Sequence, residues 1–209
     1  TLSVMNLPIT RPTLLLLDFD DVLADFNPRR RTQLLAQALG LDVQHLADAI
    51  CQARQLAVTG HHPATVDPLL EHLQQTLQLV IDPAQWHHAR MAATTVRTDC
   101  RQLLERLGHH CPLAILSNNP AALAAPIAQA LDLPGLDSAR VLTAGALGLR
   151  KPDPACFHAA LAQLGAAPAQ TLFIDNLFTN VRGARSAGLM ADTAHHAQSL
   201  RKVLKRHHL

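Results

Sequence analysis

The sequence predicts an α/β protein in which helices cover both faces of a parallel sheet. Short apolar runs alternate with helical patterns along most of the chain, which is typical of parallel strands joined by crossover helices. Apolar residues make up 48% of the 209 positions and charged residues only 16%, so the chain can bury a substantial core and disorder is not expected. This length suits one α/β domain with an insertion, or two small domains.

The first strand is expected at residues 14–19, where four leucines run into Asp18 and Phe19. Later apolar runs predict strands at residues 112–116, 140–143, 171–174 and 189–192. Helical patterns follow at residues 99–107, 121–131, 154–164, 177–187 and 197–207. Strand and helix in turn at this spacing favour a sheet that is buried on both faces.

Residues 28–96 interrupt this alternation. They contain helical patterns such as RRRTQLLAQALGL and VDPLLEHLQQTLQLV, but no convincing strand. We therefore expect residues 1–26 and 97–209 to form the sheet-containing core, and residues 27–96 to form an all-helical insertion. Ligands of open parallel sheets bind beyond the carboxyl ends of the strands, so an insertion leaving the first strand there would cover the site.

Composition argues against several classes of function. A net charge of +2 and 3% aromatic residues, with no tyrosine, give no support for nucleic-acid binding. No apolar run approaches the ~20 residues that span a bilayer. The first ten residues, TLSVMNLPIT, lack the basic and apolar regions of a secretory signal, and a cytoplasmic protein without a membrane partner is the prediction.

The cysteines and histidines show no metal-binding pattern. The four cysteines form no CxxC pair, which gives a zinc ribbon or a redox motif no support, and buried reduced thiols are expected. Ten of the 13 histidines form adjacent doublets, such as His61–His62 and His109–His110. Because neighbouring residues point to different faces and no HExxH spacing occurs, we expect surface roles for them.

Polar side chains follow the predicted strands and share the chemistry of phosphoryl transfer. A carboxylate that attacks phosphorus needs its own charge and that of the phosphate neutralised, as a lysine and Mg²⁺ can do. A second acid can protonate the leaving oxygen and then deprotonate water, and a hydroxyl can hold the phosphoryl oxygens. The residues with this chemistry stand at four places in the chain. They are Asp18 and Asp20 after the first strand, Ser117, Asn118 and Asn119 after the second, Lys151 before a helix, and Asp175 and Asn176 after the fourth strand.

The order DFDDVL, LSNN, KPD and FIDNLFTNVRGARSAGL resembles the haloacid dehalogenase-like hydrolase superfamily. These four motifs extend from Asp18 to Gly188 and cover most of the chain. The resemblance implies a Rossmann-like core with a cap domain after the first strand, in agreement with the patterns above.

The resemblance also implies roles for single residues. Asp18 is the expected nucleophile that forms an aspartyl-phosphate, and Asp20 is the expected general acid and base. Lys151 is expected to steady the nucleophile and the phosphoryl group. Ser117, with Asn118 beside it, is the expected phosphate-binding hydroxyl.

Mg²⁺ is the cofactor that the resemblance implies. Its expected ligands are Asp18, the backbone carbonyl of Asp20, and the pair Asp175 and Asn176. Asn180 is expected to support this pair.

Two residues depart from the family pattern. Asp21 replaces a glycine that would leave the strand with any φ, and we expect its added charge to face solvent. Asn176 stands where an acid is usual, and an amide oxygen brings no negative charge to the metal. This second departure keeps open a degenerate member of the family that binds rather than hydrolyses.

Arg29, Arg30 and Arg31 stand in the first turn of a predicted helix, where positive charge opposes the helix dipole. They are expected to pair with Asp21 and Asp25 or to lie in water. The alternative is that they hold an anionic group of the substrate at the boundary between insertion and core.

The sequence therefore predicts a Mg²⁺-dependent phosphatase that hydrolyses a small phosphorylated metabolite. A haloacid dehalogenase is less favoured, because those enzymes lack a second acid such as Asp20. A binding or regulatory protein on a degenerate site is the principal alternative, and it rests on Asn176.

Overall fold

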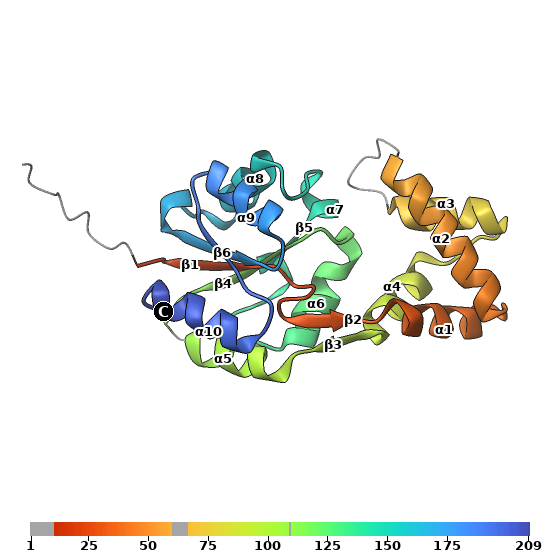
Figure 1. The fold of residues 1–209 in the computed structure, drawn as a ribbon, viewed down its shortest axis with the longest axis horizontal. Coiled ribbons are helices and arrows are strands. Elements are labelled where there is room, and N and C mark those ends of the chain that lie inside the picture. The colour runs from red at the N-terminus through yellow and green to blue at the C-terminus, as the bar shows by residue number, and fades with distance from the viewer. Residues whose placement is uncertain (1–10, 60–66, 109) are drawn as a thin grey trace, which may run out of the picture.

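The computed structural model describes residues 11–59, 67–108 and 110–209, and it shows a five-stranded parallel sheet between two layers of helices (Figure 1). The strands are β1 (Leu14–Leu17), β4 (Leu113–Ser117), β5 (Val141–Thr143), β6 (Thr171–Asp175) and β7 (Met190–Thr193). Their order in the sheet is β5-β4-β1-β6-β7, and every pairing is parallel. The predicted α/β class with a Rossmann-like parallel sheet is confirmed.

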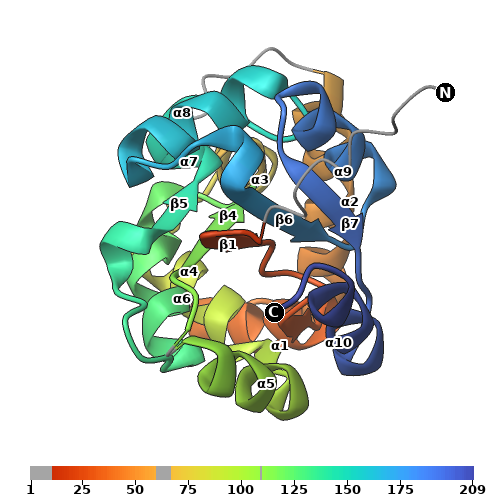
Figure 2. The same ribbon diagram turned by 90° about the vertical axis from the view of Figure 1, so that its left-hand side faces the viewer.

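Alternation along β1 divides the core between the two faces of the sheet. Leu15 and Leu17 pack with side chains of α5 (Thr98–Gly108), α6 (Ala124–Leu131) and α10 (Ala197–Arg206). On the other face Leu14 and Leu16 pack with α8 (Pro154–Leu164) and α9 (Phe178–Ser186). Figure 2 shows these two sets of helices on opposite sides of the sheet. Because both faces are covered, β1 is apolar at every position rather than at alternate ones.

Four helices lie between two short strands that leave the core beside β1. Strand β2 (Ala24–Phe26) pairs antiparallel with β3 (Thr94–Val96), and this ribbon joins the helices to the sheet domain (Figure 1). The four helices, here called the helical insertion, have a buried cluster of their own that includes Leu35, Leu46 and Trp86. They are α1 (Pro28–Leu39), α2 (Val43–Thr59), α3 (Pro68–Leu77) and α4 (Pro83–Ala92).

Three helices of the insertion, α1, α3 and α4, begin at Asn-Pro or Asp-Pro pairs. The side chain of Asn27 accepts a hydrogen bond from the backbone N–H of Arg30 (3.0 Å), and Pro28 occupies the first turn. Asp67 and Asp82 cap α3 and α4 in the same way, each followed by proline. Such a cap satisfies an otherwise unpaired backbone donor, and proline is tolerated there because its missing N–H needs no partner.

The sequence patterns missed β2, β3 and the short helix α7 (Ala144–Leu147). The expectation of no strand within residues 28–96 is wrong at β3, because three residues are too few to show a periodic pattern. The surface role was expected for histidines that include His61, His62 and His109, and these three lie outside the described residues. The first ten residues also lie outside them. Within the described residues, none of the helices combines the length and the apolar character that crossing a membrane requires.

Helix α9 packs directly on the backbone of the segment that carries Lys151. A Cβ atom on Gly183 would lie 2.0 Å from the carbonyl oxygen of Pro152 and 2.9 Å from its carbonyl carbon. The peptide bond between Lys151 and Pro152 is cis. Glycine at position 183 thus allows the close approach that places Lys151 next to the sheet.

We expect Gly183→Ala to destabilise the protein by about 1–3 kcal/mol or more, because overpacking against backbone cannot be relieved by a rotamer change. The measurement is urea denaturation, with Ser186→Ala on the exposed side of the same helix as the control. An unchanged free energy of unfolding for Gly183→Ala would show that α9 can move away without cost.

Candidate active site

Three neighbouring strands bring the predicted site residues to one edge of the sheet. Asp18 follows β1, Ser117 ends β4 and Asp175 ends β6, and the sheet order places β1 between the other two strands. Lys151 reaches the same edge from the turn before α8. The carboxyl ends of parallel strands are where open α/β sheets bind their ligands.

A buried lysine lies between two buried carboxylates. The Nζ atom of Lys151 is 2.9 Å from Oδ1 of Asp18 and 2.7 Å from Oδ2 of Asp175. The exposed fractions of these residues are 3%, 7% and 0% in the same order. Burial alone lowers the pKa of Lys151, but the charges of the two carboxylates raise it above its ordinary value, so the ammonium stays protonated.

Asp175 is fully engaged by hydrogen-bond donors. Its Oδ2 accepts from Lys151 and from the side-chain amide of Asn180 (2.9 Å), and its Oδ1 accepts from the backbone N–H of Leu177 (2.8 Å). Asn180 is buried and contacts the acid that the sequence analysis expected it to support. In this arrangement Asp175 positions Lys151, and its role as a metal ligand stays a prediction.

Asp18 keeps one oxygen free for chemistry. Its Oδ1 accepts from the backbone N–H of Phe19 (2.8 Å) and contacts Lys151, whereas its Oδ2 accepts no hydrogen bond from the described residues. Burial, opposed by the charge of Lys151 and assisted by that of Asp175, raises the pKa of Asp18 from 3.8 to about 6. A carboxylate with a raised pKa and an unbonded oxygen is a stronger nucleophile than a solvated aspartate.

Asp20 is held by Asn119, which was expected at this edge without a role, and by Arg90, which was not expected there. Arg90, in α4 of the insertion, forms an ion pair with Oδ1 at 2.6 Å, and Asn119 donates to Oδ2 at 2.9 Å. Asn119 also donates to the hydroxyl of Ser117 at 2.7 Å. Asn119 follows Ser117 by two residues, which was a signal in the sequence, whereas Arg90 is 70 positions from Asp20 and no local pattern marks it.

Asn118 binds the backbone of Lys151 rather than side chains of the site. Its amide nitrogen donates to the Lys151 carbonyl (3.0 Å), and its side-chain oxygen accepts from the Lys151 N–H (2.9 Å). This two-point contact fixes the turn that carries the ammonium group. The phosphate-binding role expected of Ser117 and Asn118 stays a prediction, and Ser117 itself is buried at the edge with its hydroxyl bonded to Asn119.

The residues at this edge can hold Mg²⁺ with few charges of their own. Among the described residues, no group of three histidine, cysteine or acidic side chains could enclose a metal ion. The unbonded oxygen of Asp18 and the half-buried amide of Asn176 stand at the ends of adjacent strands, and Mg²⁺ accepts such a set when substrate phosphate and water complete its shell. The oxygen donors therefore fit Mg²⁺, and the metal roles of Asp18, Asp20 and Asn176 stay predictions.

The charged residues between β1 and the first turn of α1 are only in part where the sequence predicted them. Asp21 is exposed to solvent, as expected, and has the left-handed φ of 59° that a glycine would adopt without strain. Asp25 pairs with Arg97 at 2.5 Å, so the expected pairing with the arginines of α1 is wrong for this acid. Arg29 and Arg30 are exposed, but Arg31 is buried.

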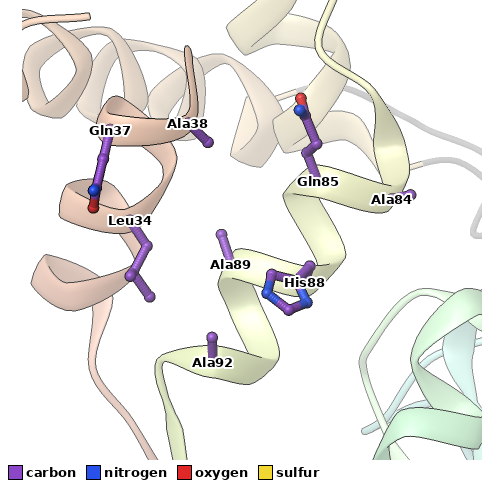
Figure 3. Close-up of a pocket in the computed structure, with 8 residues that line it drawn as sticks. All are labelled: Leu34, Gln37, Ala38, Ala84, Gln85, His88, Ala89 and Ala92. Carbon is purple, nitrogen blue, oxygen red and sulfur yellow. The ribbon is translucent and has the colours of Figure 1, made fainter. Parts of the chain in front are cut away.

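One hollow of the helical insertion lies apart from these carboxylates. Figure 3 shows α1 and α4 facing each other across a cavity of about 510 Å³. Its walls are mostly alanine and leucine, including Ala38, Ala89 and Leu34, with His88 at one side. It contains none of the residues assigned to the catalytic edge.

Comparisons with known proteins find a matching family model and a similar phosphatase. Residues 12–188 match the family model described as haloacid dehalogenase-like hydrolase. A phosphoglycolate phosphatase of Pseudomonas putida is 27% identical over 193 residues, which cover 87% of this chain and 69% of that protein.

Solved structures share the fold at lower sequence identity. The hydrolase YfnB of Bacillus subtilis, bound to magnesium, has a TM-score of 0.70 at 16% identity and covers 95% of this chain and 100% of its own. A family enzyme of Bacteroides thetaiotaomicron, in complex with magnesium and inorganic phosphate, has a TM-score of 0.61 at 18% identity over 87% of this chain and 93% of that one. A 2-haloacid dehalogenase of Pseudomonas syringae has a TM-score of 0.65 at 20% identity, and the match covers 93% of this chain and 99% of that one. At these identities the likeness shows the fold alone.

We expect Lys151→Met to lower the free energy of unfolding at pH 8 by about 3–5 kcal/mol, because it leaves two buried carboxylates without their cation. Lys151 lowers the pKa of Asp18, so its removal should raise that pKa further above about 6. An acid with a raised pKa in the folded state favours folding most below its ordinary value of 3.8 and loses that contribution as pH rises through the folded value. The loss of stability should therefore shrink as pH falls from 8 to 5.

The measurement is urea denaturation of metal-free protein across this pH range, with Lys202→Met at an exposed position of α10 as the control. The same loss at every pH would mean that the Asp18 carboxylate is not the group left uncompensated.

Proposed function

The chain belongs to the haloacid dehalogenase-like hydrolase family, and from this premise we propose that it is a Mg²⁺-dependent phosphatase of a small phosphomonoester. The observation that carries the proposal is the pair Asp18 and Asp20, of which the first has an unbonded oxygen beside a buried lysine. A dehalogenase needs only the first acid, because a departing halide takes no proton. The relative that acts on phosphoglycolate supports a phosphate ester as substrate.

In the first step Oδ2 of Asp18 attacks phosphorus, and the bond between phosphorus and the ester oxygen breaks. Asp20 gives its proton to that oxygen, so the alcohol leaves neutral and Asp20 becomes a carboxylate. In the second step Asp20 takes a proton from a water molecule, and the hydroxide attacks phosphorus of the aspartyl-phosphate. Inorganic phosphate leaves, the Asp18 carboxylate is restored, and Asp20 carries a proton again.

Lys151 and the hydroxyl of Ser117 act on the transferred group. The ammonium is already 2.9 Å from Asp18, so it can neutralise charge on an attacking carboxylate and on a phosphoryl oxygen without moving far. Asn119 orients both the Ser117 hydroxyl and Asp20, which ties phosphate binding to proton transfer. Mg²⁺ would be held by Asp18, the carbonyl of Asp20 and Asn176, and it would supply a second positive charge that offsets the charge of the phosphate.

The helical insertion would act as a cap over this edge, and it supplies Arg90 to Asp20. A covered edge favours small phosphorylated metabolites over phosphoproteins, because a folded partner would not fit beneath four helices. A cytoplasmic location and a free metabolite as the partner belong to the same proposal.

Asn176 favours a second candidate, a family member that binds a phosphorylated ligand without turnover. An amide at this position lowers the negative charge offered to Mg²⁺. Hydrolysis of a panel of phosphomonoesters, measured with and without Mg²⁺, decides between the two: turnover on none of the panel would favour the binding protein.

We expect Asp18→Asn to reduce turnover by more than about 10³-fold while leaving the fold intact, since an amide cannot attack phosphorus. Fluoride complexes that mimic phosphate should protect the wild type against thermal unfolding and should not protect the variant. Asp21→Asn, at an exposed position in the adjoining turn, is the matched control and should keep near-normal rates. Substantial turnover by Asp18→Asn would remove Asp18 as the nucleophile.

We expect Asn176→Asp to lower the Mg²⁺ concentration needed for half-maximal activity. Both carboxylate oxygens of Asp175 already accept hydrogen bonds, from Lys151, Asn180 and Leu177. Position 176 is therefore the one at which a new carboxylate can offer negative charge to the metal. A tenfold drop corresponds to ~1.4 kcal/mol of added binding free energy. The measurement is a Mg²⁺ titration of activity, or calorimetry where turnover is absent.

The control for this variant is Gln170→Glu, which adds the same charge at an exposed position just before the other end of β6. A Mg²⁺ requirement equal to or above that of the wild type would exclude Asn176 as a ligand and return the role to Asp175.

A further inference from the structure

Arg31 is a buried arginine with two side-chain nitrogens that form no hydrogen bond among the described residues. The residue is 4% exposed, and its buried Nε and Nη2 atoms donate no hydrogen bond within the described part of the chain. Its guanidinium lies over the ring of Trp86 at 4.4 Å and near the ring of Phe26 at 5.4 Å. The aromatic rings occupy the faces of the guanidinium, whereas its N–H groups at the edge stay unsatisfied.

The charge of Arg31 is not cancelled by its surroundings. Burial, and then the charges of Arg54 and Arg90, lower its pKa to about 10, so it is still positive at neutral pH. Asp67 is the acid that acts on it, but the carboxylate of Asp67 is already bonded to the indole N–H of Trp86 (2.7 Å) and to the first turn of α3. A buried cation with unbonded donors is costly, and an anionic ligand is the simplest partner for it.

A hollow of about 530 Å³ lies along Arg31 between α1 and α2. Three arginines line it, Arg29, Arg31 and Arg54, and none of the residues around it is acidic. Its remaining walls combine polar side chains such as Gln44 with apolar ones such as Ile50. The charged side chains that line the hollow are therefore all positive, and its size suits a small organic anion.

Side-chain contacts through the ring of Phe26 link Arg31 to the catalytic edge. The guanidinium of Arg90 lies 3.7 Å from the centre of the Phe26 ring, the ring that Arg31 also contacts, and Arg90 binds Asp20 at 2.6 Å. Two positive side chains, Arg90 and Arg31, thus lie one after the other between Asp20 and the hollow of the insertion.

We propose that the hollow between α1 and α2 is an oxyanion site in which Arg31 and Arg54 bind a carboxylate or phosphate group. Because Nε and Nη2 of Arg31 are covered, binding includes a turn of this side chain toward the hollow. The group is either the second anionic end of the substrate, in which case the inference rests on the proposed phosphatase function, or a free anion. Both sources share the planar or tetrahedral oxygens that a guanidinium binds through two N–H groups.

The first arm of the test compares two esters of the same length, 2-phosphoglycolate and ethyl phosphate, of which only the first has a carboxylate. Arg31→Met and Arg54→Met should lower kcat/KM for phosphoglycolate about 10- to 100-fold, mainly through KM, and should change that for ethyl phosphate less than about twofold. Arg54 is exposed, so Arg54→Met tests the site even where Arg31→Met fails to fold. The control is Arg201→Met at an exposed position of α10.

The second arm uses sulfate at millimolar concentration as the probe and measures the midpoint of thermal unfolding. Stabilisation by sulfate in the wild type and Arg201→Met, and its loss in Arg31→Met and Arg54→Met, together with unchanged kinetics, would identify a free anion. Equal losses of activity on both esters, or no effect in either arm, would overturn the site. A wild type that hydrolyses neither ester leaves the proposed function to the panel of phosphomonoesters, while the sulfate arm still decides the oxyanion site.

Discussion

The buried contact of Lys151 with Asp18 and Asp175 is the constraint on which the rest of the site depends. The buried ammonium is paired with both carboxylates, and removing it would leave both without their cation, which is strongly unfavourable in the interior. Three neighbouring features hold the group in place: Asn118 binds the Lys151 backbone, Asn180 binds Asp175, and Gly183 lets α9 approach Pro152. These three residues act on Asp18 indirectly. They hold Lys151 and Asp175 in place, and Lys151 in turn contacts one oxygen of Asp18 and leaves the other free.

The balance of charge at the edge explains why a cation and an anion can meet there. Asp18 and Asp175 bring two negative charges and Lys151 brings one positive charge, so the cluster as a whole attracts a further cation when Asp18 is ionised. The pKa of Asp18 is raised mainly by burial, which the charge of Lys151 opposes and the charge of Asp175 assists. A metal that completes the balance would also be the group that draws in a phosphate, and the neutral Asn176 leaves that attraction weaker than a second acid would.

The sequence was sufficient for the sheet and for the residues at the strand ends. Apolar runs marked each strand of the parallel sheet, and the position of a polar residue after a strand is enough to place it at the carboxyl edge. Arg90 could not be predicted in this way, because its contact with Asp20 depends on how α4 returns beside β1. Asn118 was visible in the motif, but its side chain contacts a backbone 33 residues away, which only the folded turn reveals. Arg31 looked like a surface charge because the packing of Trp86 over it is a tertiary feature.

The contacts of Asp20 connect proton transfer to the position of the helical insertion. In this structure Asp20 accepts from Arg90 on one oxygen and from Asn119 on the other, which is the arrangement of a carboxylate and not of a protonated acid. A carboxyl group that donates to a leaving oxygen must release one of these donors. Asn119 is fixed at the end of β4 with Ser117, whereas Arg90 belongs to α4 and shares Phe26 with Arg31. Movement of the insertion is therefore the simpler way to free Asp20, and a substrate that draws Arg90 toward its own anionic group would produce that movement on binding.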